Sequence, residues 1–365
     1  MTATPLRVSL AALAVFLVPL GASAQTEGSG RTVVKYGAEF LASGVGARAL
    51  GMGGAYVAHA NDVTAGYWNV AGLDGLATPE AAYMHAERFD GAVAFDYAAA
   101  AYPLSDRSTV AVSFVRSAVD DIANTLDAYD PATGQINPDD VSYFSAADNA
   151  LFVSYARGLS DRLSVGATAK VIRRGVGDFA SAWGYSVDVG AQLDLGRLQL
   201  GVNIQDAPGM VQAWSVDAER FSEVDEESRP VGLTEVVLPV ARLGAATVIP
   251  LSEDVGFTAA ADLDLAFDGQ AANVLDAGGV SFRPRLGGEL VYRDVLAFRA
   301  GIADVATSER FGTQITPAVG AGVKLGALSV DYGFGDFGGL ASELGFAHRV
   351  SLAYRFNSGA ALPAP

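Results

Sequence analysis

The chain has 365 residues, half of them apolar, with a formal net charge of −17 and no cysteine. The charge excludes nucleic acid as a partner, because binding to nucleic acid requires a basic surface. The lack of cysteine excludes disulfides, thiolate catalysis and cysteine-ligated metals. The mean hydropathy is nevertheless positive, which is unusual for an acidic soluble protein and indicates strands with one face in lipid.

The first 24 residues have the form of a secretory signal peptide. Arg7 is the positive residue, residues 8–20 form the apolar region, and Ala22-Ser23-Ala24 fits the cleavage site. The apolar region is too short to span a bilayer, so we expect cleavage near Ala24 rather than an uncleaved anchor helix. Beyond it no run of about 18 apolar residues follows, so the sequence predicts no membrane-spanning helix.

Residues 35–76 are dense in glycine and precede a long series of alternating segments. Such a segment is not a regular helix or strand throughout, because each glycine adds backbone freedom and permits a positive φ. We predict that residues 25–78 form an irregular plug that lies inside a larger structure. The run 44–54 lacks the spacing of a nucleotide-binding loop, so it is not read as one.

From residue 79 onward the chain alternates between apolar and small or polar residues. In residues 163–171, for example, every odd position is apolar, and a period of two places each set on its own face of a sheet. Roughly fourteen such strands are expected, an even number, as in single-chain outer-membrane barrels. Their approximate ranges are 79–88, 91–102, 107–116, 148–158, 161–174, 181–195, 198–206, 239–249, 254–265, 281–292, 295–303, 314–325, 327–336 and 346–356.

The connections between these strands alternate between short and long, with the first hairpin at Asp90-Gly91 as the exception. The short ones fall at 103–107, 159–162, 196–197, 250–254, 293–294 and 326, and the long ones at 117–147, 174–181, 207–238, 266–280, 303–313 and 337–345. Bacterial outer-membrane barrels have short periplasmic turns and longer external loops. The sequence therefore predicts an all-β fold, a transmembrane antiparallel barrel over 79–356 with an N-terminal plug, a short periplasmic tail over 357–365, and both chain ends on the periplasmic side. A soluble sandwich or propeller is the alternative, but it does not explain the alternation in loop length.

The glycine-rich stretch also carries a recognisable motif. Its pieces are Gly44-Val45-Gly46-Ala47-Arg48-Ala49, Gly51-Met52-Gly53-Gly54, Asn61-Asp62 and Trp68-Asn69. This stretch resembles the N-terminal signature of the PorV/PorQ family of outer-membrane barrels, which is itself similar to the FadL-type transporters of hydrophobic compounds. The chain has Asn69-Val70-Ala71 where the family usually has Asn-Pro-Ala, so the turn there must be held by Asn69 and by packing.

The resemblance implies two kinds of function. A PorV-like protein is a type IX secretion component that receives exported cargo by its C-terminal domain and passes it on for surface attachment. Its partners are outer-membrane lipid, secreted cargo and other secretion components, and we take this as the first reading. The alternative is a FadL-like channel for the uptake of a hydrophobic ligand, and a third reading is a structural barrel without a transported ligand.

Charged residues on the inner face of the predicted strands form a further candidate site. By the alternation, these lumen charges are Arg157, Lys170, Asp188, Asp262, Arg299, Lys324, Asp331 and Arg349. Buried charges persist when they are paired or hydrated, so we interpret them as ion pairs that brace the barrel and the plug. The alternative is a path for a polar or amphipathic ligand.

No catalytic, metal or cofactor site is expected. The histidines His59, His85 and His348 lie far apart and match no metal-ligand spacing, and no nucleophile-histidine-acid arrangement is readable. The acidic connections 117–147 and 207–238 are expected to be solvated loops, with cation binding or cargo docking as alternatives.

Overall fold

The computed structural model describes residues 31–34, 39–89, 91–126, 128–130, 133–221, 226–267, 275–277, 280–308, 312–336 and 346–356. The expected signal peptide and the tail 357–365 lie outside these residues. Among the described residues, no helix is long and apolar enough to cross a membrane.

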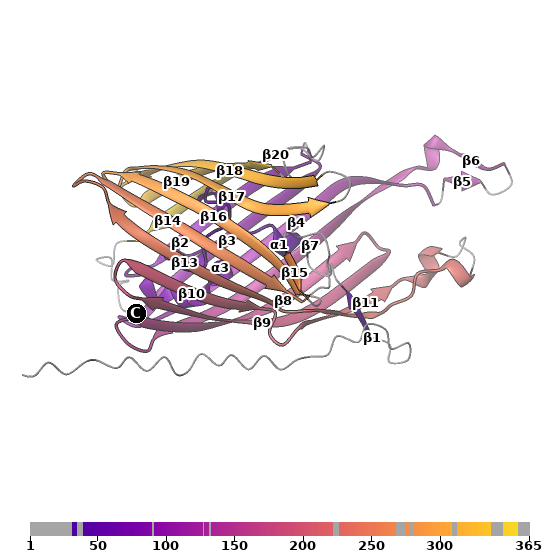
Figure 1. Ribbon diagram of the computed structural model, residues 1–365. Coiled ribbons are helices and arrows are strands. Elements are labelled where there is room, and N and C mark those ends of the chain that lie inside the picture. Colours follow the sequence, from indigo (N-terminus) through magenta and orange to yellow (C-terminus); the bar gives the residue numbers. More distant parts are fainter. Residues whose placement is uncertain are drawn as a thin grey trace, which may run out of the picture. The chain divides into compact units, whose positions relative to one another are not determined.

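Fourteen antiparallel strands form a closed barrel, which confirms the expected fold class (Figure 1). The barrel closes because β20 pairs with β2, with Arg355 opposite Glu80. In order around the wall the strands are β2 (Glu80–Arg88), β3 (Val93–Ser105), β4 (Ser108–Asn124), β7 (Ser142–Gly158), β8 (Leu163–Val176), β9 (Ala180–Asp194), β10 (Leu198–Gln205), β13 (Val240–Pro250), β14 (Val255–Ala266), β16 (Val280–Tyr292), β17 (Leu296–Ser308), β18 (Gly312–Leu325), β19 (Leu328–Asp336) and β20 (Phe346–Arg355).

The alternating side chains behave as a lipid-facing and a lumen-facing set. In β7, Leu151, Val153 and Tyr155 are exposed, whereas Phe152 and Ser154 are buried. Arg157 shares the exposed face with the first three residues, so the prediction that it points into the lumen is wrong. It lies opposite Ser108 at the end of the strand, where a long side chain reaches the interface with water.

Long hairpins extend one end of the barrel (Figure 1). β4 and β7 continue into the expected loop 117–147, and that loop also holds β5 (Tyr129–Asp130), β6 (Gln135–Ile136) and the 3-10 helix η2 (Pro138–Asp140). The expected loop 207–238 contains β11 (Met210–Val216), β12 (Thr234–Val237), η3 (Ala218–Phe221) and η4 (Glu226–Ser228). Both connections are therefore partly strand, because a hairpin that leaves the membrane keeps its ladder of backbone hydrogen bonds.

Short helices of the glycine-rich stretch fill the barrel. They are α1 (Glu39–Ala42), α2 (Ala47–Gly51), α3 (Ala65–Trp68) and the 3-10 helix η1 (Val70–Gly75). α2 packs against β17 to β20 and η1 against β4 and β7 to β9, so the plug contacts opposite walls. A barrel of this strand number is too wide for its own side chains to fill, and the plug supplies the missing core.

The first described strand, β1, lies at the end of the barrel opposite to the one that the sequence predicted. β1 (Arg31–Val34) pairs in parallel with β12, which belongs to the long-loop end of the barrel. The chain thus passes from the long-loop end through the lumen to Glu80 at the short-turn end, whereas we expected the segment before the plug at the short-turn end. A four-residue strand carries too little alternation to be seen in the sequence. It forms because β12 offers a free edge. The short strand β15 (Leu275–Ala277) pairs antiparallel with the start of β16.

Candidate functional site

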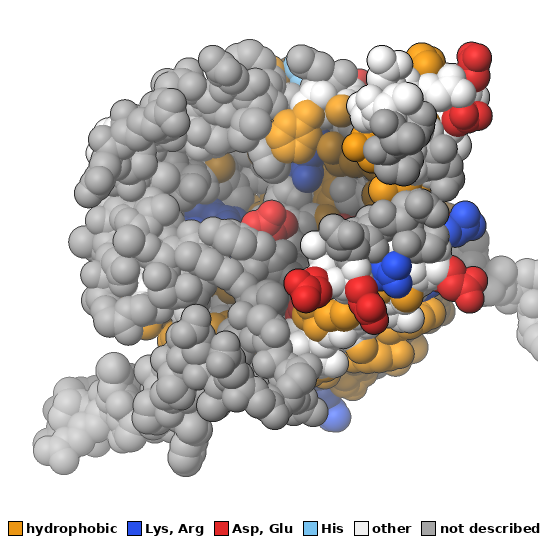
Figure 2. Space-filling model, turned by 90° about the vertical axis from the view of Figure 1, so that its right-hand side faces the viewer, with side chains coloured by type: hydrophobic (Ala, Val, Ile, Leu, Met, Phe, Trp, Pro, Cys, Tyr) orange, Lys and Arg blue, Asp and Glu red, His pale blue; other side chains and the backbone are white. Residues whose placement is uncertain are grey.

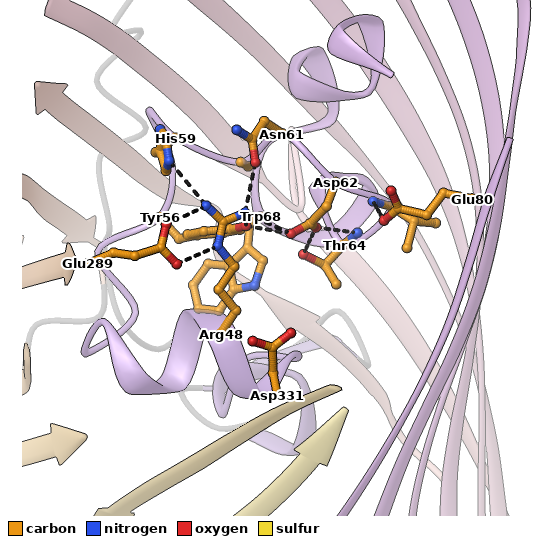
Figure 3. Close-up of polar contacts among 12 residues, drawn as sticks. Arg48, Tyr56, His59, Asn61, Asp62, Thr64, Trp68, Glu80, Glu289 and Asp331 are labelled. Carbon is orange, nitrogen blue, oxygen red and sulfur yellow. Dashed lines mark hydrogen bonds and ion pairs between the residues drawn. The ribbon is translucent and has the colours of Figure 1, made fainter. Parts of the chain in front are cut away.

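Arg48 of α2 is the centre of a polar network that joins the plug to the wall (Figure 3). Its Nη2 and Nε lie 2.7 and 2.9 Å from the two carboxylate oxygens of Glu289 on β16. Its Nη1 donates to Tyr56 Oη and Asn61 Oδ1, both at 2.9 Å, and lies 3.4 Å from Asp62 Oδ2. A planar guanidinium with five donors suits this role, because it reaches the wall and the plug at the same time.

Close backbone approach lets α2 reach the wall. A Cβ on Gly51 would lie 2.9 Å from Gly320 Cα of β18. A Cβ on Gly53, whose φ is +63°, would lie 2.6 Å from the backbone N and C of Ile302 on β17. Only glycine allows such contact. The glycines of the motif therefore bring α2 close enough to the wall for Arg48 to reach Glu289. The motif glycines Gly44, Gly46 and Gly54 also have positive φ.

The remaining motif residues fix the fold of the plug itself. Trp68 Nε1 donates to the carbonyl of Val45 at 2.9 Å. Asn69 Nδ2 donates to the carbonyl of Val57 on the plug and to that of Ala191 on β9, and its Oδ1 accepts from the backbone N of Ala71. The asparagine therefore holds the turn into η1 without the proline that the family pattern has.

The wall contributes a second layer of buried charge. Arg299 bridges Glu289 and Asp331, each at 2.6 Å, and Asp262 accepts from the backbone N of Tyr56 on the plug. Arg349 donates to the carbonyls of Ser43 and Gly44. The remaining predicted lumen charges pair as Lys170 with Asp188 and Asp206, and Lys324 with Asp294. Apart from Arg157, the predicted lumen charges lie inside the barrel, and several of them hold the plug directly.

Among the plug side chains with shifted pKa values are His59 and Asp62. Burial lowers the pKa of His59, and the neighbouring Arg48 lowers it further. The ring geometry agrees with a neutral imidazole, because Nδ1 faces Gln199 Oε1 at 2.9 Å while Nε2 faces the donor Arg48 Nη2 at 3.2 Å. Burial alone would raise the pKa of the Asp62 carboxyl, but Arg48 and Thr64 hold it below its ordinary value.

These shifts predict a plug that is weakened by acid. Below the ordinary histidine pKa, a released plug binds a proton at His59 that the seated plug excludes, and at lower pH the same holds for Asp62. Between pH 7 and pH 5 the seated plug should therefore lose stability through His59, whose lowered pKa keeps the proton off the ring in the seated state. Ion conductance of the reconstituted protein should rise over this range, and His59→Gln should flatten the rise. A conductance that is independent of pH in both proteins would contradict the assignment.

A cavity lies beneath the network at the short-turn end. Its volume is about 270 Å³, and its lining includes Arg48, Asp62, Glu80, Lys324 and Arg355. Arg355 pairs with Glu80 at 2.8 Å, so the charges here are largely matched. Such a lining suits water and disfavours an apolar molecule.

Apolar side chains gather on the opposite flank of the plug, and we name them the apolar lumen cluster. It consists of Phe40, Leu41, Tyr67, Phe152, Ile172 and Met210, which are buried in one hydrophobic core. The rings of Tyr67 and Phe152 meet edge to face, with centroids 6.3 Å apart. Buried charges border the cluster as well, because Lys170 lies over the Phe152 ring and Arg242 lies over the Tyr67 ring.

The wall beside this cluster is irregular, and across the irregular stretch the backbone N of Ala207 donates to the carbonyl of Val187 at 2.7 Å. β10 ends at Gln205 and β11 begins at Met210, and between them the ladder with β9 is broken opposite residues 186–188. Lys170, Asp188 and Asp206 form a buried ion cluster at this break. Sequence reasoning took 207–238 as a plain loop; Pro208 and Gly209 were the available signal for a broken strand.

The lumen opens at the long-loop end. Figure 2 looks onto this end and shows a hollow, with hydrophobic and charged side chains visible at its floor. Among the described residues, no group of three His, Asp or Glu side chains is arranged to hold a metal ion.

Comparison with known proteins identifies the fold. No family model and no curated protein sequence matches this chain. The CymD monoaromatic hydrocarbon channel is similar in structure, with a TM-score of 0.54 and 16% identity over 86% of this chain and 98% of that one. The Pseudomonas putida toluene transporter TodX has a TM-score of 0.54 with 11% identity over 85% and 96% of the two chains. A Pseudomonas aeruginosa FadL homologue has a TM-score of 0.50 with 13% identity over 86% and 98%. The chain has the fold of the FadL-type outer-membrane β-barrels.

Proposed function

We propose that this protein is a non-enzymatic outer-membrane channel that admits small hydrophobic compounds. The observation that carries the proposal is the apolar lumen cluster beside the wall interruption at residues 206–209. The cluster side chains are buried, so an apolar molecule that enters from the long-loop end binds by displacing them, and burial of its surface is favourable by about 25 cal/mol per Å². The similarity to channels for toluene and monoaromatic hydrocarbons supports the same class of ligand for this chain.

The charge distribution favours a sideways exit into the membrane. A hydrophobic molecule that continued straight would meet Arg48, Glu289 and the charged cavity, where an apolar molecule displaces water from charges. The break in the β9 ladder lies beside the cluster on the lipid-facing wall, and an apolar molecule would leave there once the ion cluster of Lys170, Asp188 and Asp206 moves aside. In this proposal the ion cluster of Lys170, Asp188 and Asp206 closes the sideways exit between β10 and β11. The plug blocks the leakage of ions through the lumen.

A polar substitution in the cluster tests this role. Ile172→Asn places an amide among apolar side chains and should weaken ligand binding by about 1–3 kcal/mol, which is roughly a tenfold loss or more in uptake at low ligand concentration. Ala167 faces lipid from the same strand, so Ala167→Val is the matched control and should leave uptake unchanged. Equal uptake by both variants and by the wild type would contradict the proposed route.

The type IX secretion role implied by the N-terminal motif is the second candidate. The observation that favours it is the pair of long hairpins that extend beyond the barrel, β4–β7 and β11–β12, with exposed Tyr129, Tyr143 and Val231. These hairpins offer apolar and acidic surface to a secreted cargo. We rank this role second because the similar structures are channels for hydrophobic compounds and because the lumen contains an apolar cluster.

A further inference from the structure

Two buried polar side chains border the apolar lumen cluster, and we name them the polar pair. Asn203 on β10 is 1% exposed, Arg242 on β13 is 3% exposed, and the two residues lie opposite each other in the ladder between these strands. Arg242 Cζ lies 5.5 Å from the centroid of the Trp68 ring and 5.9 Å from that of the Tyr67 ring. Since Tyr67 also meets Phe152 edge to face, the polar pair adjoins the aromatic part of the cluster.

The polar pair has hydrogen-bonding capacity that the described residues do not use. Neither the amide oxygen nor the amide nitrogen of Asn203 has a hydrogen-bond partner among these residues, and the same holds for Nε and Nη1 of Arg242. Arg242 Nε lies 3.5 Å from Asp264 Oδ2, and Asp264 Oδ1 also has no partner within the described part of the chain. Buried polar atoms are normally paired, because a buried donor or acceptor without a partner is costly. The site thus offers donors and acceptors side by side.

The polar pair also lies next to the break in the wall. Asn203 is two residues before β10 ends at Gln205, and the irregular stretch 206–209 follows. A molecule with one aromatic ring that displaces the Tyr67 side chain would therefore place a substituent within reach of the polar pair. The same molecule would lie beside the proposed exit.

The charges around the site are matched, which favours a neutral group on the ligand. One carboxylate lies between two arginines, and one lysine lies between two carboxylates, so the six charges sum to zero. They are Arg242, Asp264 and Arg285 in the first set and Asp188, Lys170 and Asp206 in the second. A charged ligand group would disturb this balance and would lose its hydration on burial.

We infer that the transported compound is a neutral aromatic molecule with a hydroxyl group, and that Asn203 and Arg242 select it by hydrogen bonds. The inference rests on the proposed channel function and names the substrate class. A hydroxyl group is donor and acceptor at once, so it donates to the Asn203 amide oxygen and accepts from Arg242 Nη1. A hydrocarbon leaves these atoms without partners, and a site built to bind a hydroxyl discriminates against an analogue that lacks it.

Three ligands of similar size test the inference, namely 4-methylphenol, toluene and 4-methylbenzoate. Their dissociation constants are measured by equilibrium dialysis against the purified full chain in lipid nanodiscs, with empty nanodiscs subtracted. The wild type should bind 4-methylphenol more tightly than 4-methylbenzoate. Asn203→Leu should reduce the preference for 4-methylphenol over toluene by about tenfold or more, because the variant cannot hydrogen-bond the hydroxyl. Asn149 lies on the outer face of β7, so Asn149→Leu is the matched control and should keep the wild-type preference.

The stability of the unliganded protein separates ligand binding from a structural role. Leucine has the branching of asparagine and removes two buried atoms that lack partners, so Asn203→Leu should unfold at the wild-type temperature or above it. The unfolding temperature is read from the shift in electrophoretic mobility on heating. A lower temperature would show that other groups or water satisfy Asn203 in the unliganded protein, and would contradict its role in selection. If leucine prevents folding, Asn203→Ala should show the same loss of preference.

The failure of this inference differs from the failure of the channel. If toluene binds and the preference is the same in the wild type and the Asn203 variants, the polar pair does not select the ligand and the channel proposal stands. Tighter binding of 4-methylbenzoate than of 4-methylphenol would refute the neutral class. If the wild type binds none of the three ligands, both the channel and this inference are wrong.

Discussion

Replacement of Gly53 by alanine is expected to unseat the plug while the barrel remains folded. The new Cβ would lie 2.6 Å from backbone atoms of Ile302, and the residue must keep a φ of +63°. The left-handed conformation and the overpacking together should cost about 2–5 kcal/mol. The wall holds its shape through interstrand hydrogen bonds, so the plug is the part that moves. Ion conductance across a planar bilayer should rise sharply, with unchanged strand content by circular dichroism.

A matched substitution controls for the loss of a glycine. At Gly75, also in the plug region, no atom lies within 4 Å of the position of an added Cβ, and φ is not positive. Gly75→Ala should therefore keep the low conductance of the wild type. If Gly53→Ala is as impermeable as Gly75→Ala, the close contact between the plug and β17 does not hold the plug in place.

Arg48→Met should have the second large effect, because it removes the link between plug and wall. Glu289 keeps Arg299 as a partner at 2.6 Å, but Asp62 loses its cation and Tyr56, Asn61 and His59 lose a donor. Removal of one partner from a buried ion pair typically costs about 3–5 kcal/mol. The expected result is a raised conductance at neutral pH and faster proteolysis of the plug, read out by mass spectrometry of the fragments.

Two further variants identify the cause. Arg107→Met removes an exposed arginine of the short turn between β3 and β4 that pairs with Asp161, and it should change neither readout. Arg48→Met with Glu289→Met leaves Arg299 paired with Asp331 and should lose less stability than the sum of the single variants. Strict additivity would show that Arg48 and Glu289 do not act as a pair.

The strands could be predicted from the sequence because lipid and lumen impose opposite chemistry on alternate residues. The range 254–265 was expected, and β14 runs from Val255 to Ala266. The short turns lie where glycine, serine and charged residues interrupt the alternation. The same rule failed at Arg157, since at a strand end the polar interface allows a charge on either face.

What the sequence could not show depends on contacts between distant residues. Arg48 and Glu289 are 241 positions apart, and neither spacing nor alternation brings them together. The break between β10 and β11 leaves both pieces with their own alternation, so it is visible only when the ladder with β9 is known.

The central claim is that the lumen conducts hydrophobic compounds. The most direct measurement is uptake of a radiolabelled monoaromatic hydrocarbon by intact cells with and without the gene, together with the set of proteins on the cell surface. Our account predicts that deletion lowers uptake at low ligand concentration, that the wild-type gene restores it, and that the surface proteins do not change. Unchanged uptake combined with loss of surface-attached proteins would contradict the channel and favour the secretion role.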